Sequence, residues 1–362
     1  MPKNKQNESF AKIKVIGVGG SGSSAVSRMM RCKLQGVDLI AINTDAQDLH
    51  HKKANLKLQI GKTVTGGLGA GMNPELGRAA AEENRGEISE ILNGADMIFI
   101  TCGLGGGTGS GASPIVAEEA KKQGALTIAV VTKPFSFEGT QRTQIAEDGL
   151  FSLKDRVDTL LIIPNDKLLG IIDSKTSLLS AFWICDEVLR QAVQGISDLI
   201  VLPGIINVDF ADIKSIMENS GSALMGVGRA RGKNRAVEAA QAAINSPLLD
   251  ISIEGARGVL FNVSGREDMT LAEINEAAKV ITEVVDPDAK VIFGAVQDER
   301  LRKRELKVTV IATGFEKPAP KNLKIFEGPK KIPVAEKKPE IAPAAEEEEW
   351  EVPAFLRKKA KK

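Results

Sequence analysis

Short apolar runs alternate with longer amphipathic stretches along the first half of the chain. The apolar runs have the length and composition of buried strands: 13–17, 38–43, 97–102, 126–132 and 159–163. The stretches between them repeat apolar residues at helical spacing, most clearly at 23–34, 74–92 and 113–123. Strands that alternate with helices predict an α/β fold with a doubly wound parallel sheet.

A long apolar stretch at residues 177–200 separates this half from the next. Its apolar residues cover much of a helical circumference, which predicts one long, buried helix. A second alternation of helices and strands follows it. The predicted helices are 211–219, 234–245 and 271–284, and the predicted strands are 224–228, 258–264, 290–294 and 307–313. We interpret these elements as a second α/β domain joined to the first through the long helix.

The composition changes after Phe315. Six prolines lie among Lys and Glu residues in the next thirty or so positions, and such a segment buries too little apolar surface to fold. A short apolar island follows it, the usual form of a partner-docking peptide: Val352, Pro353, Phe355 and Leu356, followed by Arg357. The predicted organisation is a flexible arm, a first domain, a central helix, a second domain, a disordered tail and a terminal peptide: 1–10, 11–176, 177–202, 203–315, 316–349 and 350–362.

The overall composition of the 362 residues excludes several function classes. The formal charge of +1 is unlike that of a nucleic-acid binder. No apolar run reaches the roughly 18 to 20 residues that span a bilayer, and the polar N-terminus lacks a signal-peptide core, so we expect a cytoplasmic protein. Three widely spaced cysteines and two histidines indicate neither a disulfide framework nor a zinc site.

The first glycine segment, residues 17–22, fits the G-x-G-x-x-G pattern between a predicted strand and a predicted helix. Asp45 lies 23 residues past Gly22, near the place of a ribose-binding acid. Taken alone, the segment predicts a dinucleotide site, as in an NAD-dependent oxidoreductase. A glycine-rich turn that only allows close packing is the structural alternative.

A second glycine segment, residues 103–111, also follows an apolar strand and opens a helix. Two helix N-termini with unobstructed backbone N–H groups could converge on one phosphate group, with the Thr108 and Ser110 hydroxyls as further donors. The third glycine segment, residues 66–71, could respond to a terminal phosphate or be an ordinary turn. A Walker A loop is absent, because Leu56 stands five positions before Gly61, so phosphate binding must depend on backbone amides.

With these segments in this order, the chain resembles the tubulin/FtsZ family of GTPases from residue 13 to 315 and again at the terminal peptide. Residues 105–111 resemble the family's signature loop, with Ser110 where Thr is usual. Further similar segments are 43–45, 67–71, 132–135, 137–139, 163–168 and 207–212. The similarity of residues 352–357 to a membrane-anchor docking peptide favours the cell-division branch over the tubulins. Departures include Ser24, Met72, Trp183 and Cys185.

The resemblance implies a GTP site in the first domain and a GTPase-activating role for the second. Its implied contacts with the nucleotide are Gly20, Ser21, Gly22, Ser23, Ser24, Gly107, Thr108, Gly109, Glu138, Arg142, Asn165, Phe182 and Asp186. A carboxylate at Asp186 matches the adjacent donors of guanine, and the Asn165 amide matches its O6. Without the resemblance, Asp186 is a solvated acid, Phe182 is core and Glu138 with Arg142 is a surface pair.

The resemblance also implies that Asn207, Asp209 and Asp212 are catalytic and act on the GTP of the next subunit in a head-to-tail filament. Mg²⁺ would bridge the phosphates, with no protein ligand set predicted for it. The alternative for Asp209 and Asp212 is a capped helix N-terminus. The implied function is a GTP-hydrolysing polymer of the bacterial division ring at mid-cell, which recruits membrane-anchor and regulatory proteins.

Two other classes of function remain open from the residues. An NAD-dependent oxidoreductase would leave the second glycine segment and residues 207–212 unexplained. A nucleotide-gated scaffold without turnover would not need Asp209 and Asp212. The basic residues 357–359 could also attract anionic lipid instead of a protein partner.

Overall fold

The computed structural model describes residues 11–34, 36–169, 176–201, 204–206, 208–247, 253 and 255–315. Its strands are β1 (Ile13–Val18), β2 (Val37–Asn43), β3 (Leu56–Gln59), β4 (Met97–Gly103), β5 (Leu126–Lys133), β6 (Thr159–Pro164), β7 (Gly221–Arg231), β8 (Gly258–Gly265), β9 (Lys290–Gln297) and β10 (Glu305–Thr313). The predicted linker, the terminal peptide and Asn207 lie outside the described residues.

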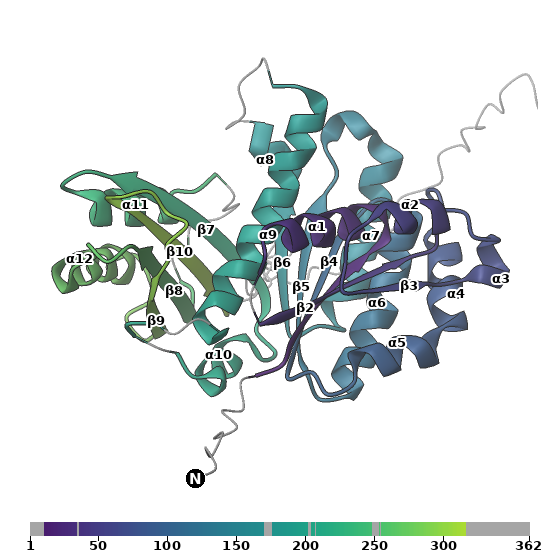
Figure 1. Ribbon diagram of the computed structural model, residues 1–362, viewed down its shortest axis with the longest axis horizontal. Helices are drawn as coiled ribbons and strands as arrows, with labels where there is room; N and C mark the ends of the chain where they lie inside the picture. The colour runs from purple at the N-terminus through teal and green to yellow at the C-terminus, as the bar shows by residue number, and fades with distance from the viewer. Residues whose placement is uncertain are drawn as a thin grey trace, which may run out of the picture. The chain divides into compact units, whose positions relative to one another are not determined.

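The helices cover both faces of these strands (Figure 1). Their bounds are α1 (Gly19–Arg31), α2 (Ala46–His51), α3 (Lys62–Thr65), α4 (Pro74–Glu83), α5 (Arg85–Leu92), α6 (Gly107–Lys122), α7 (Thr140–Lys154), α8 (Asn165–Leu169), α9 (Leu178–Val201), α10 (Phe210–Met217), α11 (Arg235–Ile244) and α12 (Leu271–Thr282). A short 3₁₀ helix, η1 (Ser136–Glu138), precedes α7.

One ten-stranded sheet runs through the described chain in the order β3-β2-β1-β4-β5-β6-β7-β10-β8-β9. The strands from β3 to β6 are parallel, as the alternation of strands and helices predicts. The direction of strand addition reverses between β1 and β4. In such sheets the crevice at the carboxyl ends of the strands on either side of that reversal is the usual ligand site.

Two cores fill the space between the parallel strands and their helices. One contains Val15, Phe99 and Val130 together with apolar residues of α1, α9 and α10. The other contains Ile16 and Ile100 together with apolar residues of α4, α5, α6 and α7. Because neighbouring residues of a strand point to opposite faces, both faces are buried and the strands are almost wholly apolar. Helices α1 and α6, which follow β1 and β4, therefore lie on opposite faces.

Helix α9 joins the two halves of the sheet through packing. Its Leu189, Val193 and Leu199 belong to the same core as Leu260 of β8 and Ile311 of β10. On the other face of these later strands, α11 and α12 form a separate core with β8 and β10. The prediction of one long helix at 177–200 is confirmed, and the apolar residues of α9 from Val188 to Leu199 are buried. Its first turns are not, because Leu179, Phe182 and Trp183 are exposed.

Three predicted helices differ from the structure in their bounds. The predicted helix 74–92 is wrong as one element, because α4 ends and α5 begins at Asn84, whose side chain bonds to other groups. The helices predicted at 23–34 and 113–123 begin earlier, at Gly19 and Gly107. Glycine has low helix propensity, and packing against neighbouring elements overrides it here. The sequence pattern did not predict β3, α2, α3, α7 and α8.

Candidate functional site

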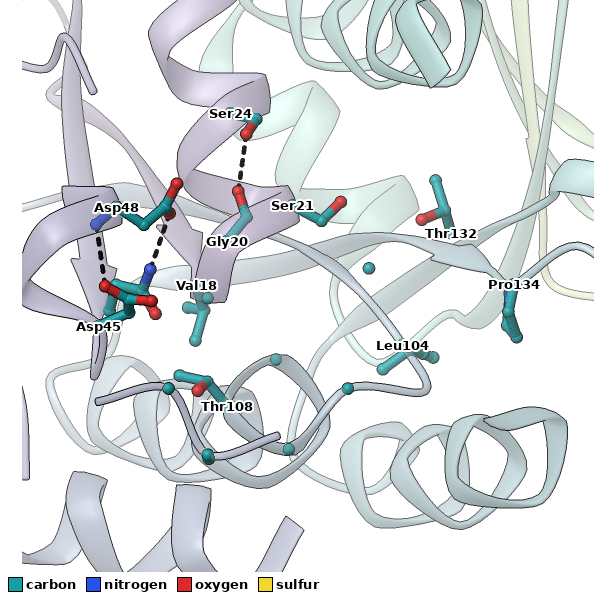
Figure 2. A pocket seen from close by; sticks show the side chains of 18 of the residues that line it. Val18, Gly20, Ser21, Ser24, Asp45, Asp48, Leu104, Thr108, Thr132 and Pro134 are labelled. Atoms are coloured by element: carbon teal, nitrogen blue, oxygen red, sulfur yellow. Dashed lines mark hydrogen bonds between the residues drawn. The ribbon is translucent and has the colours of Figure 1, made fainter. Parts of the chain in front are cut away.

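A cavity of about 500 Å³ opens at the carboxyl ends of β1, β2, β4 and β5, on both sides of the reversal in strand order. Figure 2 shows Val18 and Gly20 from one side of it and Leu104 and Thr108 from another. All three glycine segments contribute to its wall. The cavity therefore lies where the topology of the sheet predicts a ligand.

The N-termini of α1 and α6 meet in this cavity. Neither helix has a side-chain cap at its N-terminus, and neither has an acidic residue in its first turn. At Gly19, with φ of +74°, an added Cβ would lie 3.0 Å from the backbone nitrogen of Gly109, so the two ends almost touch. Uncapped N–H groups and two dipole ends directed at one space form a binding site for an anion, in particular a phosphate chain.

The third glycine segment is attached to α2 and to the second glycine segment by backbone hydrogen bonds. Gly67 O accepts from Ala46 N at 3.0 Å, and Gly71 O accepts from Gly107 N at 2.6 Å. Gly69, Ala70 and Gly71 lie on the cavity wall. These bonds hold the third glycine segment in place as part of the cavity wall.

A polar cluster that the sequence did not predict lies beside the first glycine segment. Lys52 Nζ is 2.8 Å from Asp48 Oδ1 and donates to Ser24 Oγ at 2.9 Å. Asn43 Nδ2 donates to the other oxygen of Asp48 at 2.9 Å. Lys52 and Arg142 are the cations among the wall residues. Both are paired with carboxylates of the same wall, Lys52 with Asp48 and Arg142 with Glu138, so the attraction for a polyanion comes from the two helix ends.

The far wall of the cavity comes from α8 and α9. Asn165 is 5% exposed, and its Oδ1 has no hydrogen-bond partner among the described residues. Phe182 lies edge-on to Phe135 with ring centroids 5.6 Å apart. A buried amide with a free polar atom beside an aromatic ring suits a flat ligand with hydrogen-bonding edges.

Asp186 completes this wall and is held by an unpredicted partner. Arg28 Nη2 of α1 donates to Asp186 Oδ2 at 2.9 Å, and the Arg28 guanidinium lies 5.0 Å from the centre of the Trp183 ring. Burial raises the pKa of Asp186 to about 6, against the opposing charge of Arg28. The carboxylate therefore remains mostly ionised at neutral pH.

Glu138 and Arg142 form an ion pair at the cavity wall. Arg142 Nη1 donates to Glu138 Oε2 at 2.8 Å, and the other oxygen of Glu138 accepts from Phe135 N at 2.9 Å. The two residues form the i,i+4 ion pair that their spacing predicts, and they also lie on the cavity wall. The interpretation as a surface pair is therefore compatible with the interpretation as nucleotide contacts.

The structure brings together on this wall nearly all residues predicted to contact a nucleotide. The exceptions are Gly22 and Ser23, which face the interior: a Cβ on Gly22 would lie 2.3 Å from Thr101 O, and Ser23 is fully buried. Ser110, expected as a further donor, instead accepts from Gly105 N at 2.9 Å and braces its own segment. Thr108 does line the cavity.

Asp209 and Asp212 lie away from the cavity wall, at the start of α10. Asp209 caps this helix by accepting from Ala211 N at 3.2 Å, and both aspartates are exposed. At the other end of α10, Met217 O accepts from Thr159, which begins β6. Helix α10 is therefore anchored at the amino end of the parallel strands, whereas the cavity lies at their carboxyl ends.

No group of three or more His, Cys, Asp or Glu side chains that could hold a metal ion occurs within the described ranges. In the same part of the chain, no helix is both long and apolar enough to cross a membrane.

Comparison with known proteins gives the family. Residues 12–173 match the family model described as Tubulin/FtsZ family, GTPase domain, and residues 221–316 match FtsZ family, C-terminal domain. The chain is 48% identical to an FtsZ from M. jannaschii solved as an empty dimer, with a TM-score of 0.82 and coverage of 85% of this chain and 89% of that one.

More distant similarity extends to two proteins of Haloferax volcanii. CetZ2, solved as a GTPγS-bound protofilament, is 23% identical with a TM-score of 0.72, covering 84% of this chain and 94% of that one. CetZ1, a GDP-bound monomer, is 24% identical with a TM-score of 0.71, covering 84% and 95%. At these identities the similarity supports the fold alone.

Proposed function

The chain belongs to the tubulin/FtsZ family of GTPases, and we propose that it binds and hydrolyses GTP in the cavity at the ends of β1 and β4. The observation that carries this proposal is the meeting of two uncapped helix N-termini in a cavity whose far wall holds Asn165 and Asp186. One end of the cavity suits phosphates and the other suits a base.

The phosphates would bind to backbone N–H groups at the first turns of α1 and α6. Gly20, Ser21, Thr108 and Gly109 lie at these turns and on the wall. Arg142 would add fixed donors for phosphate oxygens. Bound Mg²⁺ would neutralise phosphate charge, with phosphate oxygens and water as its main ligands, because the described residues form no acidic cage and such sites need only one or two carboxylates.

The base would lie against Phe182 with its edge toward Asp186 and Asn165. The ionised carboxylate accepts from the N1–H and the exocyclic amine of guanine, and the Asn165 amide pairs with O6. Adenine has neither an N1–H nor an amine at C2, so with ATP the buried carboxylate would keep only its bond from Arg28. This difference supports GTP over ATP as the substrate.

Hydrolysis would occur at a site shared between two subunits. The exposed carboxylates of Asp209 and Asp212, with Asn207, would lie against the cavity of the next subunit and orient the attacking water. Their distance from their own cavity supports this arrangement. GTP turnover would then be activated by assembly.

Exposed apolar side chains at both ends support head-to-tail contact. Leu68 and Phe137, in segments that contribute to the cavity, are 71% and 61% exposed. Before the start of α10, Ile205 is 61% exposed. A contact between two different surfaces that does not close into a ring produces an open filament. The dimer formed by the M. jannaschii FtsZ is consistent with self-association.

We further propose that these filaments form a division ring at mid-cell on the inner face of the membrane. The family assignment supports this role. The segment 352–357 would bind membrane-anchor and regulatory proteins, with Phe355 and Leu356 as apolar anchors.

Sedimentation with GTP, GDP or NAD, together with phosphate release, tests the proposal. We expect pelleting with GTP and a phosphate-release rate per subunit that rises with protein concentration. Binding of NAD without turnover of GTP would replace the proposal with the oxidoreductase alternative. Assembly without phosphate release would indicate a scaffold, and a rate per subunit independent of concentration would contradict the shared site.

A further inference from the structure

Lys52 is a cation on the wall of the cavity, and no sequence motif marks it. It follows the last residue of α2, and the backbone N–H of the next residue, Lys53, donates to Ser27 Oγ of α1 at 3.0 Å. The chain after α2 is therefore fastened to α1. The Lys52 side chain lies along the same helix, where its Nζ donates to Ser24 Oγ at 2.9 Å.

The partner of Lys52 is a carboxylate that faces the phosphate end of the cavity. Asp48 Oδ1 is 2.8 Å from Lys52 Nζ. The other oxygen, Asp48 Oδ2, would lie 3.6 Å from a Cβ on Gly20, in the first turn of α1, which has no side-chain cap. Figure 2 shows Asp48 on the same side of the cavity as Gly20. A negative charge therefore lies next to the backbone N–H groups that would bind phosphates.

The wall of the cavity contains more acids than bases. Among the described residues its carboxylates and its cations are, respectively, Asp45, Asp48, Glu138 and Asp186, and Lys52 and Arg142. Glu138 is paired with Arg142, and Asp186 is paired with Arg28 from outside the wall. Asp45 caps α2 and forms no ion pair within the described ranges. Without the charge of Lys52, both Asp45 and Asp48 would therefore be unpaired acids in a site for a polyanion.

The pair of Lys52 and Asp48 is held more firmly than an ordinary i,i+4 pair on a helix surface, which contributes little. The two side chains are only 20% and 31% exposed. Each also has a second partner from another element, since Lys52 bonds to Ser24 of α1 and Asp48 accepts from Asn43 at the end of β2. Charges in such a partly enclosed wall are screened less than charges in bulk water, so an unpaired carboxylate there would repel phosphate.

We propose that Lys52 is a positioning residue for the nucleotide, whose ammonium neutralises Asp48 and so allows the triphosphate to reach the first turn of α1. Lys52 acts through Asp48, and the attraction itself comes from the helix ends. The affinity of the site for a phosphate chain therefore depends on a residue outside the glycine segments. The inference rests on the proposed binding of GTP in this cavity.

Titration of Lys52→Met with a fluorescent GTP analogue tests this role, because methionine keeps most of the side-chain length and removes the charge. EDTA in the buffer prevents a metal ion from replacing the ammonium. We expect affinity at 0.05 M salt to fall at least about tenfold through repulsion by Asp48. The loss should shrink at 0.5 M salt, where the Debye length falls from about 14 to about 4 Å. Lys53→Met, at an exposed position off the wall, is the control, and urea denaturation checks that each variant is folded.

Adding Asp48→Asn to Lys52→Met separates neutralisation from direct contact with phosphate. Without the carboxylate no ammonium is needed, so the double variant should bind GTP within about threefold of the unmodified chain. Asp48→Asn alone should bind at least as tightly as the unmodified chain. A loss that persists in the double variant, or unchanged affinity in Lys52→Met, would overturn the proposal. If the unmodified chain does not bind GTP at all, the proposed function fails and this inference fails with it.

Discussion

Two effects act in opposite directions on the pKa of Asp186. Burial raises it by favouring the protonated form, and the charge of Arg28 lowers it by favouring the ionised form. Arg28 is in turn held over the ring of Trp183, at 5.0 Å from its centre. The ion pair keeps the carboxylate available at neutral pH in a wall where an isolated aspartate would tend to become neutral. Arg28 therefore acts on the base pocket through Asp186.

The raised pKa of Asp186 predicts pH-dependent binding of GTP. Only the ionised carboxylate accepts both guanine donors, so affinity should fall as the pH drops through about 6. From pH 7.5 to 5.5 the expected loss is roughly fourfold beyond that caused by phosphate protonation. Titration with a fluorescent GTP analogue at several pH values measures this loss. Asp186→Asn is the control, because it has no carboxylate to titrate and its affinity should change with pH only through protonation of the phosphates. Equal slopes in both proteins would contradict this role.

Substitution of Asp186 by Ala should reduce discrimination between GTP and ATP. Hydrogen bonds to charged groups contribute about 1.5 to 3 kcal/mol, so the preference should fall by roughly 10- to 100-fold. Competition binding with the two nucleotides measures the ratio. Glu187→Ala, one position along α9 and paired with Arg190 away from the cavity, should leave the ratio unchanged. An unchanged ratio in Asp186→Ala would remove this residue from base recognition.

At the scale of residues, a local sequence motif could identify some of the cavity residues and not others. Ser24 closely follows the first glycine segment and Thr108 belongs to the second, and both lie on the cavity wall. Gly22 and Ser23 do not, because α1 begins at Gly19 and its helical phase turns them inward. Lys52 and Arg28 carry no motif, and only the fold brings them to the site.

At the scale of elements, close packing explains where the helices begin. A Cβ at Gly111 would lie 2.0 Å from Pro74 O, so the glycines of α6 allow α4 to approach it closely. Propensity alone indicates a loop for such a sequence, whereas the structure has a helix. The alternation of strands and helices was sufficient to predict the parallel sheet. It could not predict the short β3, α2 and α3, whose apolar patterns are too brief.

Asn84, between α4 and α5, should contribute measurably to stability. Its Oδ1 accepts from Gly61 N at 2.7 Å, and its Nδ2 donates to Glu87 at 2.7 Å. Asn84→Ala leaves the buried Gly61 N–H unpaired, so we expect a loss of about 1 to 3 kcal/mol in the free energy of unfolding. Urea denaturation measures it, with the exposed Asn93→Ala as the control. Equal stability of both variants would show that water replaces the lost bonds.

Gly20→Val should prevent nucleotide binding without disturbing the fold. Gly20 lies on the cavity wall, and the nearest atom to an added Cβ is Asp48 Oδ2 at 3.6 Å, so the side chain fits while occupying the phosphate end. We expect GTP affinity to fall by at least about tenfold, with a change in stability within about 1 kcal/mol. Gly86→Val, where an added Cβ meets nothing within 4 Å, is the control. Retained affinity in Gly20→Val would place the phosphates elsewhere.

At the scale of the whole molecule, the cavity and the α10 aspartates lie toward different ends of the parallel strands. The pattern of residues alone could not show this separation, and only the family resemblance implied it, because β6 and the start of β7 join the two halves through pairing that has no local signal. A single chain therefore presents the predicted binding residues and the predicted catalytic residues on separate surfaces. If Asp212 acts on a bound phosphate, as proposed, another molecule must bring it there.

Mixing two inactive variants tests that requirement. Asp212→Ala keeps an intact cavity, and Gly20→Val keeps an intact Asp212. Each alone should release almost no phosphate, but a joint with the cavity of the first and the aspartate of the second is complete. With equal amounts and random order, roughly a quarter of the joints are complete, so turnover should recover to about that share of the unmodified rate. Asp212→Ala mixed with Asp209→Ala carries both lesions on one surface and should recover nothing. If the first mixture stays as inactive as its components, hydrolysis does not use a site shared in this way.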